Sequence, residues 1–168
     1  MYHLVIVQCI KTLKQIETYL DKAEKFAAAK KFDVAVLMND QLAPDMRNFI
    51  YQVQSACDYV KAGAGWLSGQ RPPKHADNEQ NIADLRARLQ KTIAFAESVT
   101  EEEYVGAHDR KIAWPGEPGK LFAGDDYLLQ IVVPNALFHI TMAYAILRHN
   151  GVELGKRDFL GSLRLIAA

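Results

Sequence analysis

Two polar side chains, Asn135 and His139, lie four residues apart in the segment PNALFHITMAYAILRHNG, residues 134–151. A four-residue step places both side chains on one face of a helix. An imidazole nitrogen and an amide oxygen can each bind a metal ion or hydrogen-bond a ligand. The spacing therefore indicates one of two things: a metal or ligand site inside a helical protein, or two core polar groups satisfied by buried neighbours or a water.

The residues around this pair predict that it faces inward. Apolar residues at steps of three and four continue on both sides of it, in the stripe Leu128, Ile131, Asn135, His139, Met142 and Ile146. Burial of a polar side chain costs free energy unless the side chain finds partners. Pro134 adds about 3 kcal/mol in a regular helix interior, because it lacks a backbone N–H, and we expect a kink there.

A third polar group comes from an earlier helix. Gln52 lies at the border of the apolar stripe of that helix, on one line with Asp45 and Tyr59. Side chains on facing helices of a bundle commonly build ligand and metal sites. Gln52, Asn135 and His139 therefore form the candidate set, although no two histidines form an HxxxH or HExxH motif.

Four long amphipathic segments carry these residues. The apolar period predicts helices over residues 4–29, from Pro44 to Ser68, from a capping pair at Asp77 and Gln80 to Ala96, and over residues 124–150. Short runs at 112–114 and 120–122 flank a Pro/Gly turn and predict a β-hairpin. A helical turn is expected after Asp33, and residues 152–168 are expected to dock as a tail. We predict an all-α fold: one domain, residues 1–168, built as a four-helix bundle with a small β-hairpin before the last long helix.

Two glycines and two tryptophans are predicted to have packing roles. Gly63 and Gly65, in KAGAGW, fall inside the second long segment and indicate close helix packing rather than a phosphate loop. Trp66 and Trp114 are each either core residues or pocket walls, and the core is favoured.

Composition argues against several classes of function. Lys plus Arg and Asp plus Glu each number 20, so no global field attracts nucleic acid or an anionic membrane. The uncharged run 127–147 is long enough to cross a bilayer, but its polar residues and proline favour a bundle helix. Cys9 and Cys57 form no metal or disulfide motif. Without a signal-peptide pattern at the amino terminus, we expect a cytoplasmic protein.

Three segments carry a family resemblance: QLAPDM (41–46), QVQSACDYVKAGAGWLSG (52–69) and DYLLQIVVPNALFHITMAYAILRHNGVELGKRDFLG (126–161). Together with the hairpin, they resemble the DinB/YfiT-like superfamily of four-helix bundles, which is described as metal-dependent enzymes. The resemblance covers nearly the whole chain and is nearest to an uncharacterised bacterial branch. It is specific in the carboxy-terminal segment, whereas the first and third helices match only in kind.

The resemblance also implies a ligand set. In DinB-like proteins three histidines typically bind a divalent metal, one from the second helix and an HxxxH pair from the later one. These positions fall on Gln52, Asn135 and His139 of this chain, so that one histidine remains. Amide oxygens suit harder cations and bind them weakly without carboxylates. The expected site is a degenerate metal site that holds no cofactor, or that binds a divalent metal such as Zn or Ni weakly.

Two classes of function stay open. The first is an uncharacterised DinB-like protein whose buried polar pocket binds a small molecule, or which acts as a non-catalytic homodimeric module. The alternative is a divalent-metal-dependent enzyme of the group-transfer kind, a thiol transferase or hydrolase, with His139 as ligand or general base. Neither nucleic acid nor a membrane is expected as a partner.

Overall fold

The computed structural model describes residues 1–166. Its long helices are α1 (Tyr2–Lys30), α3 (Phe49–Ser68), α4 (Ile82–Ser98) and α6 (Val133–His149). The shorter helical elements are α2 (Ala35–Asn39), η1 (Glu102–Tyr104), η2 (Ala107–Asp109), α5 (Gly124–Asp126), η3 (Tyr127–Val132) and α7 (Lys156–Leu160). The strands are β1 (Lys111–Ala113) and β2 (Leu121–Ala123).

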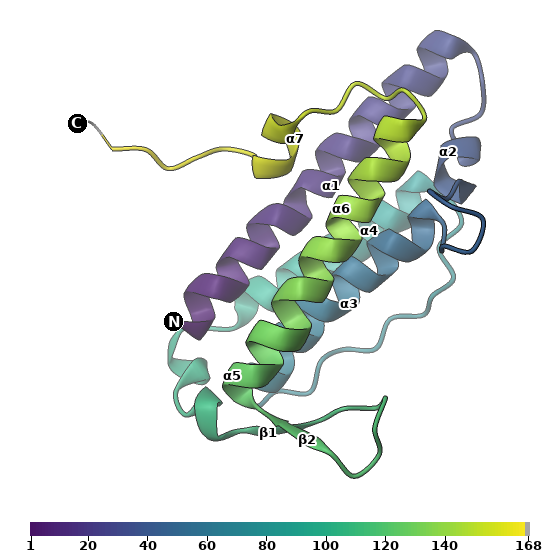
Figure 1. Cartoon of the computed structure of the whole chain (residues 1–168). Coiled ribbons are helices and arrows are strands. Elements are labelled where there is room, and N and C mark those ends of the chain that lie inside the picture. Colours follow the sequence, from purple (N-terminus) through teal and green to yellow (C-terminus); the bar gives the residue numbers. More distant parts are fainter. Residues whose placement is uncertain (167–168) are drawn as a thin grey trace.

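The four long helices lie side by side as a bundle, and the hairpin sits at one end of it (Figure 1). Helix α3 contacts all three other long helices, α6 most extensively. Strands β1 and β2 pair antiparallel with Ile112 opposite Phe122. The predicted all-α bundle with a small hairpin before the last long helix is confirmed.

Helix α3 begins five residues later than the sequence predicts. The side chain of Asn48 accepts a hydrogen bond from the backbone N–H of Tyr51 at 3.1 Å and so caps a helix that starts at Phe49. Pro44 and Asp45 lie in the preceding loop. The expectation that they open the helix is wrong, because the asparagine cap lies closer to the periodic segment.

Helix α4 shows the same kind of difference. Its cap is Asn81, whose side chain accepts the N–H of Asp84 at 3.0 Å. The predicted capping pair, Asp77 and Gln80, lies in the loop before it. That loop is therefore longer than expected, and its acidic side chains are available for contacts elsewhere.

The irregularity expected at Pro134 takes the form of a π-helical turn. Element η3 is π-helical and joins α5 to α6, and Pro134 lies in the first turn of α6. A proline cannot donate the backbone hydrogen bond that a continuous α-helix would require here. A π-turn contains one residue more than an α-turn, which rotates the following face by about 100°.

This rotation makes the middle of the predicted inward stripe of the last helix wrong by about one residue, whereas its ends, Leu128 and Ile146, are buried as predicted. The fully buried line from η3 into α6 is Leu128, Val132, Ala136, Ile140, Ala143 and Leu147. The predicted positions Ile131, Asn135, His139 and Met142 are only half-buried, at the flank of the helix. Both lines are rich in apolar residues, so the hydrophobic period did not separate them.

Gly63 lets α3 and η3 approach closely. A Cβ atom on Gly63 would lie 2.5 Å from Cγ1 of Val132, closer than two carbon atoms can pack. A Cβ on Gly65 would lie 2.7 Å from Cγ of Pro72. The close packing predicted for KAGAGW is confirmed, with a loop rather than a helix against the second glycine.

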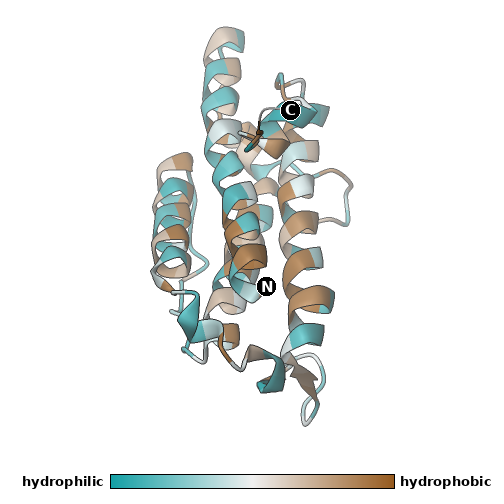
Figure 2. Ribbon diagram, turned by 90° about the vertical axis from the view of Figure 1, so that its left-hand side faces the viewer, coloured by the Kyte–Doolittle hydropathy of each residue, from teal (hydrophilic) through white to brown (hydrophobic). Residues whose placement is uncertain are grey.

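The stretch from α5 through α6 is the most apolar part of the bundle, as Figure 2 shows for the helix that follows the hairpin. Residues Gly124–His149 are the one helical stretch among residues 1–166 that is long and apolar enough to cross a membrane. Core helices of soluble proteins pass the same test, and α6 packs against α3 and α1. We therefore interpret it as a bundle helix, although Leu129, Leu137 and Phe138 remain exposed on it.

Candidate functional site

The side chains of Gln52 and His139 meet across the seam between α3 and α6. His139 Nδ1 lies 2.8 Å from Gln52 Oε1, and Gln52 is only 2% exposed. The Gln52 amide Nε2 donates to the carbonyl of Arg47, in the loop before α3, at 3.0 Å. The structure thus brings together two of the three residues selected from the sequence.

The hydrogen bonds of Gln52 assign the tautomer of His139. Because the amide nitrogen of Gln52 is used on the Arg47 carbonyl, its oxygen faces the imidazole and accepts. His139 Nδ1 therefore carries the proton. Burial lowers the pKa of His139 below its ordinary value, which favours the neutral ring with its lone pair on Nε2.

Aromatic rings surround this imidazole. Tyr59 stacks on it, with ring centroids 5.7 Å apart and an interplanar angle of 12°. Tyr51 and Phe138 approach it edge-on, at centroid distances of 6.2 and 5.2 Å. Helical spacing predicted that Tyr59 lies on the same side of its helix as Gln52. Tyr51 and Phe138 are sequence neighbours of the site residues, but the sequence analysis did not identify them as part of the site. The rings make the surroundings of His139 apolar and account for its lowered pKa.

The side chain of Asn135 hydrogen-bonds to the backbone of its own helical segment. Its side-chain amide donates to the backbone carbonyl of Ile131 at 2.7 Å. That carbonyl belongs to the π-turn, one turn before the break that Pro134 creates. No hydrogen bond within residues 1–166 joins Asn135 to Gln52 or His139. Its position supports a local structural role at the helix junction.

The donor set fits a tightly held transition metal poorly. Zinc and nickel sites are built from imidazole, thiolate and carboxylate groups, and here only His139 offers one of these. The oxygen of Gln52 already accepts from His139, and the Asn135 amide is directed at its own backbone. Within residues 1–166, no group of three or more His, Cys, Asp or Glu side chains could hold a metal ion.

Tyr59 also lines a cleft of about 710 Å³ between α3 and the hairpin. Trp66 of α3, Trp114 beside β1, and Tyr127 of η3 form further aromatic walls. Trp66 is 42% exposed and Trp114 is half-buried. The expectation that these tryptophans belong to the core is therefore wrong, because they line a cleft whose second wall, the hairpin, comes from a distant part of the sequence.

The cleft contains a few polar groups among its aromatic walls. Burial raises the pKa of Tyr127 to about 12, and burial, with Tyr51 and Asp58 nearby, also raises the pKa of Tyr59. Both hydroxyls therefore stay protonated at neutral pH. Arg110 and Lys111 add positive charge at the hairpin side. An apolar cleft with a few placed polar groups is typical of a small-molecule site.

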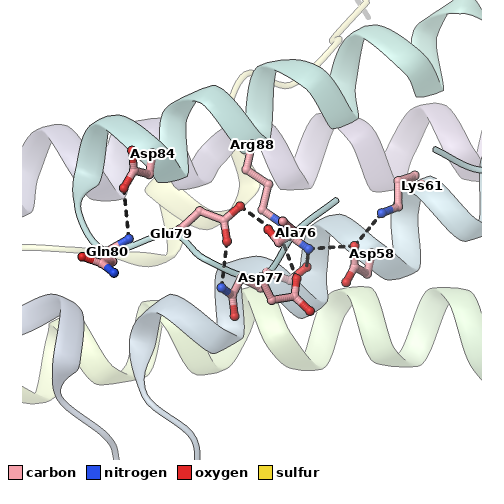
Figure 3. Close-up of polar contacts among 9 residues, drawn as sticks. Asp58, Lys61, Ala76, Asp77, Glu79, Gln80, Asp84 and Arg88 are labelled. Atoms are coloured by element: carbon pink, nitrogen blue, oxygen red, sulfur yellow. Dashed lines mark hydrogen bonds and ion pairs between the residues drawn. The ribbon is translucent and has the colours of Figure 1, made fainter. Parts of the chain in front are cut away.

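A second polar cluster lies on the seam between α3 and α4 (Figure 3). The guanidinium of Arg88, a residue 2% exposed, pairs with Asp58 at 2.8 Å, Asp77 at 2.9 Å and Glu79 at 3.0 Å. Gln54 Nε2 donates to the other oxygen of Glu79 at 2.8 Å. These bonds fasten the loop before α4 to both helices.

This cluster was missed by the sequence analysis. The available signal was the position of Arg88, three residues after Leu85 and therefore on the buried side of α4. Spacing alone cannot show that the acidic partners come from α3 and from a loop. The cluster acts as a structural tether, because the buried cation is compensated by carboxylates.

Comparison with known proteins agrees with this architecture. The family described as a domain of unknown function (DUF1993) matches residues 1–160. A crystal structure of a DinB family member protein from Shewanella denitrificans is similar with a TM-score of 0.95 at 44% sequence identity, covering 99% of this chain and 95% of that chain. No curated protein matches.

The bundle, its hairpin and the histidine on the last long helix define a DinB-like protein, as the sequence resemblance predicted. More particularly, the chain belongs to the family described as DUF1993.

Proposed function

We propose that this protein is a metal-independent DinB-like bundle that binds a small planar molecule in the cleft between α3 and the hairpin. The observation that carries the proposal is the position of Tyr59, whose ring stacks on His139 and also lines the cleft. His139, at which the family resemblance implies a metal ligand, would then support Tyr59 as one wall of a binding site.

The chemistry of the cleft indicates the class of ligand. Four aromatic side chains, Tyr59, Trp66, Trp114 and Tyr127, favour a flat ring system that can stack between them. The tyrosine hydroxyls can donate hydrogen bonds to an acceptor on the ring. Arg110 and Lys111 favour a carboxylate or another anionic substituent over a cationic one, because the carboxylate of the lining, Asp58, is already paired with Arg88 and Lys61. A planar aromatic acid meets all three requirements.

The Gln52–His139 pair has a positioning role in this proposal. The Arg47 carbonyl fixes Gln52, Gln52 fixes the imidazole, and the imidazole supports the ring of Tyr59. A wall held in place before the ligand arrives loses less conformational entropy on binding.

Tryptophan fluorescence provides a direct test. The chain contains two tryptophans, and both line the cleft. We would titrate the protein with indole-3-carboxylate, nicotinate and adenosine and confirm each response by calorimetry. We expect saturable binding of an aromatic acid, with a dissociation constant on the order of 10–1000 µM for a ligand of about a dozen heavy atoms.

Matched variants locate the binding. Trp114→Ala should abolish the calorimetric signal and Tyr59→Leu should weaken it several-fold. Leu121→Ala, an exposed position of the same hairpin, should leave it unchanged. If the three probes give no heat and no fluorescence change, the cleft is not the binding site for this class of molecule.

The metalloenzyme alternative is tested on the same protein. We expect substoichiometric metal in untagged protein and no rise of the melting temperature with Zn²⁺ or Ni²⁺, because the donor set lacks anionic groups. Stoichiometric metal, with a melting-temperature rise that His139→Leu removes, would replace the binding proposal with the enzyme alternative.

A further inference from the structure

A further cleft, of about 860 Å³, lies between α4 and the loop before it, residues 69–81. This loop runs back along the bundle from the end of α3 to the start of α4 (Figure 1). The cleft shares no lining residue with the cleft between α3 and the hairpin. Its charged lining residues are Lys74, Glu79, Asp84, Arg88 and Lys91. The arrangement and the partners of these charges decide what the cleft can bind.

The opposite directions of the loop and of α4 separate the two signs of charge. The backbone N–H of Gln80 donates to Asp84 Oδ2 at 3.0 Å, so the end of the loop lies at the start of the helix (Figure 3). Lys91 lies about 10 Å beyond Asp84 along α4, near enough to His75 for its charge to act on that ring. The cleft therefore has an acidic end at the start of α4 and a basic end further along it.

The carboxylates of the acidic end are already bound by protein donors. Glu79 accepts from Gln54 Nε2 at 2.8 Å and pairs with the guanidinium of Arg88 at 3.0 Å. Asp84 accepts the backbone N–H of Gln80. A cationic ligand would have to compete with these donors, so the acidic end does not favour one.

The basic end has polar groups without partners. Within residues 1–166, neither Lys74 nor Lys91 forms an ion pair, and the paired cations near them are Lys61 and Arg88. His75 Nδ1 and Arg88 Nε are buried, and neither has a hydrogen-bond partner among these residues. Arg88 Nε–H can only donate, and a buried donor without an acceptor destabilises the fold. An acceptor-bearing ligand at this end would remove that destabilisation.

The surroundings of His75 are positively charged. Burial lowers the pKa of His75, and the net effect of neighbouring charges lowers it further. The charges that act on the ring are those of Lys61, Arg88, Lys91 and, in the opposite direction, Asp58. The acidic residues of the same loop, Asp77 and Glu79, are paired with Arg88. An anion beside His75 would be attracted by the cations and would favour the protonated ring, which donates from both nitrogens.

We propose that the basic end of this cleft binds the phosphate group of a small molecule, with Lys74, His75 and Lys91 as its donors. A tetrahedral dianion has enough oxygen atoms to accept from two ammonium groups and an imidazole at once. The cleft is larger than one phosphate group and continues past the small side chain of Ala87 to Asn78. That part suits an uncharged polar body attached to the phosphate. The site does not depend on the proposed aromatic ligand, because the two clefts are separate.

Calorimetry of the full chain in a phosphate-free buffer at pH 7 tests the binding. The probes are glycerol 3-phosphate, inorganic phosphate and glycerol. We expect saturable binding of both phosphates, with the ester the tighter and a dissociation constant on the order of 0.1–1 mM for a ligand of about ten heavy atoms. Glycerol should give no signal. If neither phosphate binds, the proposal is overturned; equal affinities would overturn the assignment to an ester in favour of the free ion.

Matched lysine variants locate the site. Lys74→Met and Lys91→Met should each weaken the binding of glycerol 3-phosphate about 3- to 10-fold, because each removes one charge-assisted hydrogen bond, and K74M/K91M should abolish it. Both positions are exposed, so the fold should be retained, which circular dichroism checks. Lys25→Met makes the same change of net charge at an exposed position of α1 and should leave the affinity unchanged. Unchanged affinity in K74M/K91M would contradict the site.

The protonation of His75 gives a readout that a purely structural loop would not show. Sulfate is the probe, because its charge is constant between pH 8 and pH 5.5. Since a bound dianion favours the charged ring, saturating sulfate should raise the pKa of His75, followed by NMR, and sulfate should bind several-fold more tightly as the pH decreases. His75→Gln should remove this pH dependence. A pKa of His75 that does not change at saturating sulfate would exclude His75 as a donor to the anion.

Discussion

Helix α3 takes part in two polar seams that differ in chemistry. Towards α4 it presents Asp58 and Gln54, which meet the buried guanidinium of Arg88 and its partner Glu79. Towards α6 it presents Gln52 and Tyr59, which meet the neutral imidazole of His139. One seam is ionic and closed around a cation; the other is uncharged and bordered by aromatic rings.

The difference in charge between the two seams determines what each of them can bind. In the ionic seam the guanidinium already supplies the positive charge that the carboxylates require, so those carboxylates are committed to a protein group. In the neutral seam the described side chains that meet, Gln52, Tyr59 and His139, include no carboxylate that could stabilise a metal cation. The neutral seam is therefore suited to positioning a binding wall, and the ionic seam to holding the loop before α4.

The largest effect is expected from Arg88→Met. Glu79 has a side chain only 9% exposed, and it would stay buried without its cation. We expect a loss of about 3–5 kcal/mol in the free energy of unfolding, measured by urea denaturation at pH 7. Arg86→Met on the same helix is the matched control, because the side chains of its partners Glu17, Asp21 and Glu24 are 32%, 56% and 49% exposed, and it should cost about 1 kcal/mol or less. Equal losses would contradict the distinction between a buried and a surface ion cluster.

Gly63→Ala tests the packing between the neutral seam and the π-turn. The new Cβ would clash with Val132, and overpacking of this kind costs about 1–3 kcal/mol. The double variant G63A/V132A should recover part of the loss in the same denaturation experiment. An additive double variant would show that the two residues do not limit each other's packing.

His139→Leu addresses the neutral seam directly. Gln52 Oε1 would remain buried without a donor, which costs about 1–2 kcal/mol. Q52L/H139L removes both partners and should be more stable than the sum of the single variants predicts. A double-mutant cycle by thermal unfolding measures this coupling, and a coupling energy of zero would mean that the hydrogen bond contributes nothing to the seam.

The smallest expected effect is a dependence of stability on pH. Burial lowers the pKa of His139 in the folded state, so between that value and the ordinary pKa of about 6.5 the unfolded chain binds more protons. Stability is then fully present above pH 6.5 and falls as the pH decreases. Melting temperatures between pH 7 and 5 should decrease less in His139→Leu than in the natural chain.

His75 provides the control for this experiment. Burial, with Lys61 and Arg88 nearby, also lowers its pKa, so His75→Gln should remove a separate part of the same slope. Glu79 titrates outside this range. Burial acts to raise its pKa, but hydrogen bonds from Gln54 and Arg88 leave it below its ordinary value, so its contribution is lost only in stronger acid. A slope unchanged in both histidine variants would contradict the assignment.

The periodicity of the sequence was sufficient for the bundle, because its long helices have distinct apolar faces, and the Pro/Gly turn between two short runs was sufficient for the hairpin. Gln52 and His139 were selected as members of one candidate site, but the hydrogen bond between them was not predicted. The face of α6 was misassigned because the π-turn adds a residue, and both Ile131 and Val132 are apolar enough to face the core. Helix starts were misplaced where two capping residues compete within a few positions.

The remaining features depend on contacts between distant segments. Asn135 looked like a site residue because its i−4 hydrogen bond to the backbone is invisible in a list of residue types. The cleft needs the hairpin to fold back against Trp66, and the Arg88 cluster needs a loop to return to α3. No local pattern in one sequence specifies such returns.

The π-turn at Tyr127–Val132 divides one long helix into two parts that face different sites. Tyr127 belongs to the ligand cleft, whereas His139 belongs to the seam with α3. Deleting a single residue of the turn would return the segment to α-helical geometry and turn Tyr127 by about 100° relative to α6. The contents of the cleft could then change while the hydrogen bond of His139 stays in place. In this protein the length of one helical turn, and not only its composition, is a variable through which evolution can alter a binding site.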